Sequence, residues 1–323
     1  MRGPLYIRDF KCIASRCQHS CCIGWEIDID SATLEKYKQC DKERGSRLCE
    51  SICLGTAGEA CFRMGDGGRC PQLASDGLCE IIKALGEEYL SDICREHPRF
   101  YHECDEEAEV GIGLCCEAAA ELILTSDGWG ELVPIASGEG DTDTDAGYAS
   151  QRTAERRDNT LADCASAEGF SASRERERLY CLLGDRRKEL DERLDELRKI
   201  AGIDEDRIRD KILSVLPALE YLDGEYESLL TLALRRGAGA LYDEYGERAL
   251  AYFIFRYVSP ARDKEDMLSR LRLALGLEKM LSSILNMPTI VDKYGVFECA
   301  RKLSEEIEYN EDNIDILRFA LDG

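Results

Sequence analysis

The spacing of apolar residues predicts helices from about residue 174 to the end of the chain. Leu179, Leu182 and Leu183 recur at three- and four-residue steps between charged residues, as the core face of a helix requires. The aromatic stretch "LYDEYGERALAYFIFRYV" (241–258) has the same spacing, so we interpret it as core. The helical runs cover 174–197, 205–222, 225–236, 239–258, 264–285 and 297–321, with breaks at Gly224, Gly237, Pro260 and Pro288. This pattern indicates a helical bundle or array.

The chain before residue 174 has a different pattern. Residues 134–173 are rich in Gly, Ser, Thr, Asp and Ala without a sustained period, which predicts a flexible linker or long loop. Within them "DTDTDAG" (141–147) lacks the turn glycine and the closing glutamate of a calcium loop, so we do not expect calcium there. Near the N-terminus "WEIDID" (25–30) alternates apolar and acidic residues, and it is the one strand that we predict.

The predicted fold is mainly α and has three parts. A Cys-rich metal-binding domain of loops and helices covers residues 1–133, a linker covers 134–173, and an α-helical domain covers 174–323. The N-terminus lacks the apolar run of a signal peptide, and no stretch approaches the roughly eighteen apolar residues of a membrane span. We therefore expect a soluble, cytoplasmic protein without a membrane partner.

The acidic composition restricts the partners. A formal charge of −23 argues against binding nucleic acid, because neutralising phosphates requires clustered Lys and Arg. The same charge would attract cationic partners, although keeping the protein soluble is a sufficient explanation.

The cysteines are concentrated at the N-terminal end. Fourteen of the 17 cysteines and all three histidines lie within residues 1–116. In a reducing cytoplasm such a cluster indicates metal binding or catalysis rather than disulfides. If their segment is helical, Cys17 and Cys21 lie one turn apart on one face, and Cys70, Cys79 and Cys94 stand beside turn signals.

The spacing leaves the kind of metal open. The chain has no C-x-x-C pair, the usual signature of structural zinc, whereas iron-sulfur clusters tolerate varied spacings on four cysteines. A nucleophilic cysteine with His19, His97 or His102 as its base ranks low, since no spacing selects a pair. Simple packing of a small apolar side chain remains the interpretation for Cys40, Cys104, Cys164, Cys181 and Cys299.

Three stretches resemble the flagellin lysine-N-methylase family in order and content. They are "FKCIASRCQHSCCIGWEIDID", "GGRCPQLASDGLCEIIKALGEEYLSDICREHPR" and "GLCCEAAAELIL". The C-terminal stretches "EYGERALAYFIFRYV" and "ARKLSEEIEYNEDNIDIL" extend the resemblance over nearly the whole chain, except for 134–173. Tyr309 stands where relatives often carry His, His97 where Tyr is common, and Cys116 where Pro is usual.

The resemblance implies a protein-lysine N-methyltransferase that uses S-adenosylmethionine, carries a [4Fe-4S] cluster and acts on a lysine-bearing protein such as flagellin. Zinc is the alternative to the cluster. The preferred four ligands are Cys17, Cys21, Cys22 and Cys94, and Cys116 competes with Cys115 for one motif position. The candidate ligands by resemblance are Cys12, Cys17, Cys21, Cys22, Cys70, Cys79, Cys94 and Cys115.

Methyl transfer to lysine requires the neutral amine, whereas free lysine titrates near about 10.4. Tyr101, Tyr252, Tyr257, Glu308 and Tyr309 are candidates for helping its deprotonation. No G-x-G-x-x-G turn is present, so we do not expect a Rossmann methyltransferase domain. The alternative function is a non-catalytic iron-sulfur or zinc protein that transfers electrons or binds a partner.

Overall fold

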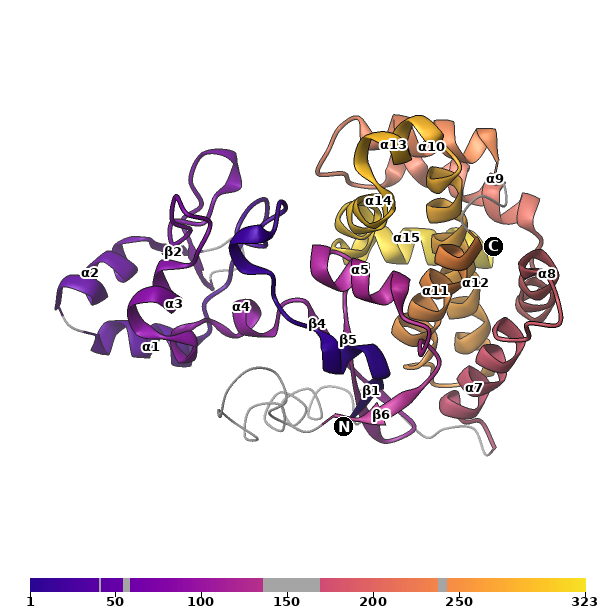
Figure 1. The fold of residues 1–323 in the computed structure, drawn as a ribbon, viewed down its shortest axis with the longest axis horizontal. Helices are drawn as coiled ribbons and strands as arrows, with labels where there is room; N and C mark the ends of the chain where they lie inside the picture. The colour runs from indigo at the N-terminus through magenta and orange to yellow at the C-terminus, as the bar shows by residue number, and fades with distance from the viewer. Residues whose placement is uncertain (41, 55–58, 136–168, 238–242) are drawn as a thin grey trace. The chain divides into compact units, whose positions relative to one another are not determined.

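The computed structural model describes residues 1–40, 42–54, 59–135, 169–237 and 243–323 (Figure 1). The chain is mainly α, as predicted. Most of the predicted linker, including "DTDTDAG" and Cys164, lies outside the described residues.

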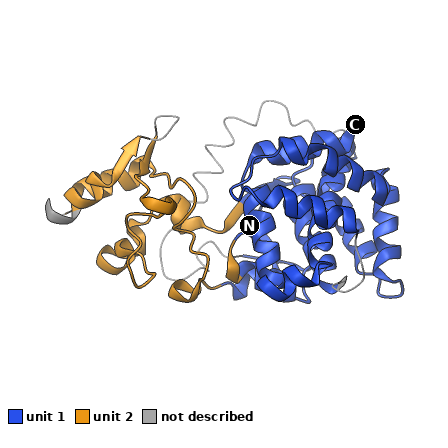
Figure 2. Cartoon of the chain, turned by 90° about the horizontal axis from the view of Figure 1, so that it is seen from above, with its two compact units in different colours: residues 1–10, 101–115, 119–323 blue, residues 11–100, 116–118 orange. Residues whose placement is uncertain are grey.

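The chain divides into two compact units (Figure 2). The small unit comprises residues 11–100 and 116–118, and the large unit comprises residues 1–10, 101–115 and 119–323. The predicted Cys-rich domain, residues 1–133, is therefore divided between the two units. Its residues 1–10, 101–115 and 119–133 belong to the large unit.

The large unit contains the helices that the sequence periodicity predicts. The central one is α12 (Lys264–Leu285), which matches the predicted run 264–285. It is buried on most of its surface and contacts α8, α9, α10, α11, α14 and α15. The side chain of Asp263 caps it by accepting a hydrogen bond from the Asp266 N–H at 2.9 Å. The other α-helices are α5 (Glu117–Thr125, which begins in the small unit), α7 (Ala172–Leu183), α8 (Leu190–Ala201), α9 (Glu205–Val215), α10 (Tyr226–Arg236), α11 (Asp243–Phe253), α13 (Pro288–Tyr294), α14 (Val296–Leu303) and α15 (Glu311–Asp322).

Two helices of the large unit end in π-helical turns. Helix α11 continues into a π turn at Ile254–Val258, and α14 continues into another at Ser304–Glu308. The predicted run 297–321 is therefore broken after the second turn, where the Asn310 side chain caps α15. π-Helical turns are rare and are frequent at functional sites, so their residues are candidates for chemistry.

A four-stranded sheet in the large unit was not predicted. Its order is β4-β5-β1-β6, with β1 parallel to β5 and antiparallel to β6. Strands β4 and β5 are joined by Asp105 and Glu106, whose φ angles of 49° and 72° suit a two-residue hairpin turn. The strands are β1 (Arg2–Pro4), β4 (Arg99–Cys104, which begins in the small unit), β5 (Glu107–Ile112) and β6 (Leu132–Pro134).

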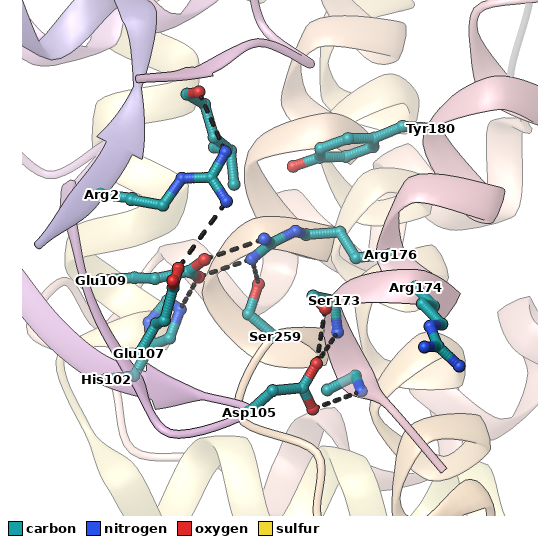
Figure 3. Close-up of polar contacts among 12 residues, drawn as sticks. Arg2, His102, Asp105, Glu107, Glu109, Ser173, Arg174, Arg176, Tyr180 and Ser259 are labelled. Atoms are coloured by element: carbon teal, nitrogen blue, oxygen red, sulfur yellow. Dashed lines mark hydrogen bonds and ion pairs between the residues drawn. The ribbon is translucent and has the colours of Figure 1, made fainter. Parts of the chain in front are cut away.

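A buried ion pair joins this sheet to the helices (Figure 3). Arg176 of α7 donates to both carboxylate oxygens of Glu109 on β5, at 2.5 and 2.8 Å, and to the Ser259 hydroxyl at 2.6 Å. Both charged side chains are only 2% exposed. Asp105 accepts hydrogen bonds from the Ala172 and Ser173 N–H groups and so caps the start of the same helix.

The small unit is built from short elements around its own apolar core. They are α1 (Ser31–Gln39), α2 (Lys42–Glu50), β2 (Ile52–Leu54), β3 (Ala60–Phe62), α3 (Glu80–Leu85) and α4 (Asp92–Glu96). The core gathers Ile27, Ile29, Tyr37, Leu48, Phe62, Cys70, Leu73 and Ile81.

The predicted strand "WEIDID" is not a regular strand. Its alternation is real, because Ile27 and Ile29 are buried, and its backbone bonds to β3 through Ile29 N–H to Ala60 O at 2.8 Å and Phe62 N–H to Ile27 O at 3.0 Å. The pairing is limited to an isolated bridge between Asp28 and Cys61. The prediction of a strand is therefore wrong, although the inward-facing residues are those expected.

None of the helices within the described ranges is long and apolar enough to cross a membrane.

Candidate functional site

Four of the eight predicted thiols converge in the small unit. Cys70 belongs to its apolar core, and the other three pack against that core from different elements. Cys79 directly precedes α3 and Cys94 lies within α4, while the Cys70 N–H donates to the Cys22 carbonyl at 2.8 Å. We call Cys22, Cys70, Cys79 and Cys94 the four-thiol group.

The pKa values show that these thiols are close neighbours. Burial is the largest cause that raises the pKa of Cys70 to about 12, and the thiols of Cys22, Cys94 and Cys79 contribute to the same increase. Burial likewise raises the pKa of Cys94 to about 11 and that of Cys79, and in both cases Cys22 adds to the increase. Every pair within the four-thiol group interacts in this way. Bringing buried thiolates together would be costly without a cation between them.

Cys22 differs from the other three. A hydrogen bond from the Cys21 thiol lowers the pKa of Cys22 to about 7 despite its burial, and the Ser20 hydroxyl and the Arg69 guanidinium act in the same direction. Cys22 is therefore the member of the group that most readily provides a thiolate at neutral pH, which is the form that binds metal.

The spacing of the thiols bears on the kind of metal. Within the described ranges, the only group of three or more Cys, His or acidic residues with ligand atoms all within 4.8 Å of one another is Glu26, Asp28 and Glu59. No three sulfur atoms of the four-thiol group therefore lie all within 4.8 Å of one another, whereas roughly 3.8 Å separates the sulfurs of a tetrahedral zinc site. A four-iron cluster places each thiolate on a different iron, so its four sulfur ligands stand farther apart than those around one zinc ion.

The remaining predicted ligands lie outside the four-thiol group. Cys21 borders the group: its thiol donates a hydrogen bond to the Cys22 sulfur and lies near Cys12 and Cys94. That hydrogen bond, burial of the thiol and these neighbours all raise the pKa of Cys21. Cys17 instead donates to the His19 carbonyl at 3.2 Å. The set preferred from the sequence therefore shares Cys22 and Cys94 with the group.

The adjacent cysteines 115 and 116 fall in different units. Cys116 belongs to the small unit, where it is close enough to Cys17 to raise the pKa of that thiol. Cys115 belongs to the large unit, beside Tyr252 and Arg256.

Among the cysteines interpreted as packing residues, Cys104 and Cys299 are buried, as expected. Cys40 is half-buried and donates to the Lys36 carbonyl at 3.4 Å. Cys181 is exposed, so its assignment to the core is wrong: it lies on the outer face of α7.

The candidate histidine bases have other neighbours. His97 packs against Trp25 with ring centroids 6.0 Å apart, and burial lowers its pKa to about 4. His102 lies 3.0 Å from the Glu109 carboxylate in the large unit. Both are polar residues of the fold, and neither interaction is with a thiol.

A second polar cluster connects the two π-helical turns of the large unit. Glu308, at the end of the second turn, accepts from the Tyr257 hydroxyl at 2.8 Å and from the Tyr252 hydroxyl at 3.1 Å on the same carboxylate oxygen. Arg256 pairs with that oxygen at 3.2 Å. We call Tyr252, Arg256, Tyr257 and Glu308 the tyrosine–carboxylate cluster.

The two tyrosines of this cluster differ in how accessible their hydroxyl groups are to a ligand. Tyr252 is 2% exposed, and its oxygen also accepts from Arg256 at 3.0 Å and from the Leu114 N–H at 3.4 Å. Tyr257 is only half-buried. Burial raises the pKa of both tyrosines well above 10, so both are protonated donors to Glu308 rather than tyrosinates.

Three of the five residues guessed from the sequence are thus in contact, and Arg256 was missed. Arg256 could have been predicted from the sequence, because it lies four residues after Tyr252 and directly before Tyr257. Tyr309 follows Glu308 but is 41% exposed, and Tyr101 lies on β4.

Comparisons with known proteins give the family of the chain. Lysine-N-methylases of Salmonella choleraesuis (strain SC-B67) and Salmonella typhimurium (strain LT2) are each 30% identical over 127 residues, which are 38% of this chain. The match spans 31% of those relatives, about a third of their length. Flagellar biosynthetic protein FliU of Salmonella muenchen is also 30% identical over 127 residues, covering 75% of that protein. No family model and no solved structure matches the chain. With three quarters of FliU matched at this identity, the chain belongs to the FliU family.

Proposed function

We propose that this protein is a protein-lysine N-methyltransferase that uses S-adenosylmethionine and holds a [4Fe-4S] cluster on the four-thiol group. The observation that carries the proposal is the similarity to relatives named lysine-N-methylase. The name of FliU, a flagellar biosynthetic protein, fits a flagellar protein as the substrate, and the resemblance of the sequence motifs points to flagellin.

The four-thiol group supplies the ligands of the proposed cluster. Its members come from three separate stretches of the small unit, so a cluster would cross-link segments that otherwise share a small apolar core. A cluster with four cysteine ligands supplies such cross-links and one-electron chemistry.

The methyl transfer itself places demands on the protein. The bond from carbon to the sulfonium sulfur breaks and leaves its electron pair on sulfur, while the amine nitrogen forms the new bond to carbon. The amine must therefore have lost a proton to solvent beforehand, so that its lone pair is free. A site that disfavours the ammonium form promotes this loss.

The tyrosine–carboxylate cluster has the chemistry to bind such an amine. Because Tyr257 donates its proton to Glu308 and accepts from Arg256, its oxygen keeps one lone pair that can accept an N–H bond from a neutral lysine. Arg256 is paired with the Glu308 carboxylate at 3.2 Å, so burial of the amine against the cluster, rather than a net positive charge, would lower the pKa of an incoming ammonium. In this proposal Tyr257 positions the amine. Glu308 holds the Tyr257 hydroxyl by accepting its hydrogen bond, and Tyr252 holds Arg256 by accepting another.

The cluster is tested by iron and sulfide analysis of protein purified without oxygen. Cys70→Ser and Cys79→Ser should lose most iron and sulfide, whereas Cys40→Ser and Cys17→Ser should retain them. Loss of iron in Cys17→Ser with retention in Cys70→Ser would contradict the ligand assignment. A colourless wild-type protein that contains zinc would favour the zinc alternative.

The activity is tested by incubating the protein with flagellin and S-adenosylmethionine labelled in its methyl group. Label on lysine side chains is expected. Tyr257→Phe should reduce the rate by about 10- to 100-fold, because it removes the oxygen that positions the amine. Tyr294→Phe, at an exposed position, is the matched control. Iron-loaded protein that transfers no label to any lysine-bearing protein would favour the non-catalytic alternative.

A further inference from the structure

A second pair of thiols in the small unit lies apart from the four-thiol group. Cys53 of β2 and Cys61 of β3 are directly opposite each other in the antiparallel ladder. Their sulfur atoms are 3.3 Å apart. We propose that Cys53 and Cys61 form a reversible disulfide when the protein meets hydrogen peroxide. This proposal does not depend on the methyltransferase function.

The backbone already has the geometry that a disulfide needs. Directly opposed residues of an antiparallel pair have Cα atoms about 4.5–5.5 Å apart. That interval lies inside the range of about 4.4–6.8 Å found for bonded cysteines. The two sulfur atoms can therefore form a bond without a change in the register of the two strands.

The pair lies on the opposite face of the hairpin from the core. Ile52 and Phe62, next to the two cysteines in sequence, pack into the core that contains Cys70. Because neighbouring strand residues point to opposite faces, the sulfur atoms of Cys53 and Cys61 point away from the four-thiol group. Oxidation of this pair therefore leaves the proposed cluster ligands untouched.

The exposure of the two thiols sets the order of the reaction. Cys61 is 1% exposed, whereas Cys53 is half-buried and accessible to a small oxidant. The Cys53 sulfur attacks one peroxide oxygen, the O–O bond breaks, and a sulfenic acid and water form. The Cys61 sulfur then attacks the Cys53 sulfur, the S–O bond breaks, and a second water leaves with the thiol proton. Overall two thiols and one peroxide give one disulfide and two waters.

The surroundings select a small neutral oxidant. Glu26, Asp28 and Glu59 gather their carboxylates on this face, and Asp28 forms the bridge to Cys61. This negative charge repels glutathione disulfide, which is itself anionic at neutral pH, but not hydrogen peroxide. Peroxide should therefore oxidise the pair faster than glutathione disulfide at the same concentration.

The sequence allows a direct test on the whole protein. Trypsin releases residues 48–63 as one peptide, and cleavage after Glu50 and Glu59 then puts Cys49, Cys53 and Cys61 on three separate fragments. The protein is treated with peroxide or with glutathione disulfide, its remaining thiols are alkylated, and the digest is analysed by mass spectrometry.

The expected product is a linked pair of the fragments 51–59 and 60–63, formed preferentially with peroxide and separated by dithiothreitol. Cys53→Ser should abolish the link, and Cys181→Ser, which changes an exposed cysteine of the large unit, should preserve it. Full alkylation of Cys53 and Cys61 in peroxide-treated protein would overturn the proposal. So would a link from Cys53 to Cys49.

Discussion

The buried pair of Glu109 and Arg176 gives the sharpest prediction on stability. Replacing Glu109 with Leu removes a carboxylate that accepts two hydrogen bonds from Arg176 (Figure 3). The Ser259 hydroxyl would remain beside the guanidinium, but it carries no charge. Because Arg176 is only 2% exposed, its charge would stay in a poorly solvated site without a counter-ion.

The cost follows from this burial. Breaking a buried ion pair from one side typically costs about 3–5 kcal/mol. Folded domains are stable by about 5–15 kcal/mol, so the substitution would remove a large part of the free energy of unfolding. With a urea dependence of about 1–3 kcal/mol per molar, the midpoint should fall by about 1–5 M.

The assay is urea unfolding of the full chain, monitored by circular dichroism. Glu107→Leu is the control, because Glu107 lies on the same strand but pairs with Arg2 at the surface, 3.7 Å away. It should cost less than about 1 kcal/mol. Adding Arg176→Met to Glu109→Leu should recover part of the loss, since both charges are then absent. A loss under about 1 kcal/mol in Glu109→Leu, or strictly additive effects in the double variant, would refute the reasoning.

Three further outcomes are expected. Burial raises the pKa of Glu278 to about 7 from 4.5, so the stabilising contribution of its protonated form is complete below about pH 4.5 and is lost as pH rises through 7. Glu278→Gln should therefore stabilise the protein by about 3 kcal/mol in thermal unfolding at pH 8 and have no effect at pH 4, and equal effects at both would contradict this. Asp263→Ala should cost about 1 kcal/mol in urea unfolding, because it removes the cap of α12, and no loss would count against the cap. The methylation rate should fall with increasing salt, because ions screen the attraction of a chain of charge −23 for a lysine-bearing substrate, and a constant rate would exclude such steering.

The sequence by itself predicted the helices of the C-terminal half, and it predicted thiol chemistry in the N-terminal part. Apolar spacing gave the bounds of α12, because a helix buried on one or more faces must repeat its apolar residues with the helical period. The concentration of cysteines in residues 1–116 pointed to a metal site there. The alternation in "WEIDID" correctly assigned Ile27 and Ile29 to the core.

Only the tertiary structure decided which residues meet. Cys22, Cys70, Cys79 and Cys94 lie far apart along the chain, and the folding of the loops around one core brings them together. The short strands of the four-stranded sheet carry weak patterns of their own, because β5 buries its last four residues consecutively instead of alternately. The π-helical turns could not be predicted from the sequence either, because packing against neighbouring helices decides where an extra residue enters a turn. That packing places Glu308 against Tyr252 and Tyr257, more than fifty positions earlier in the chain.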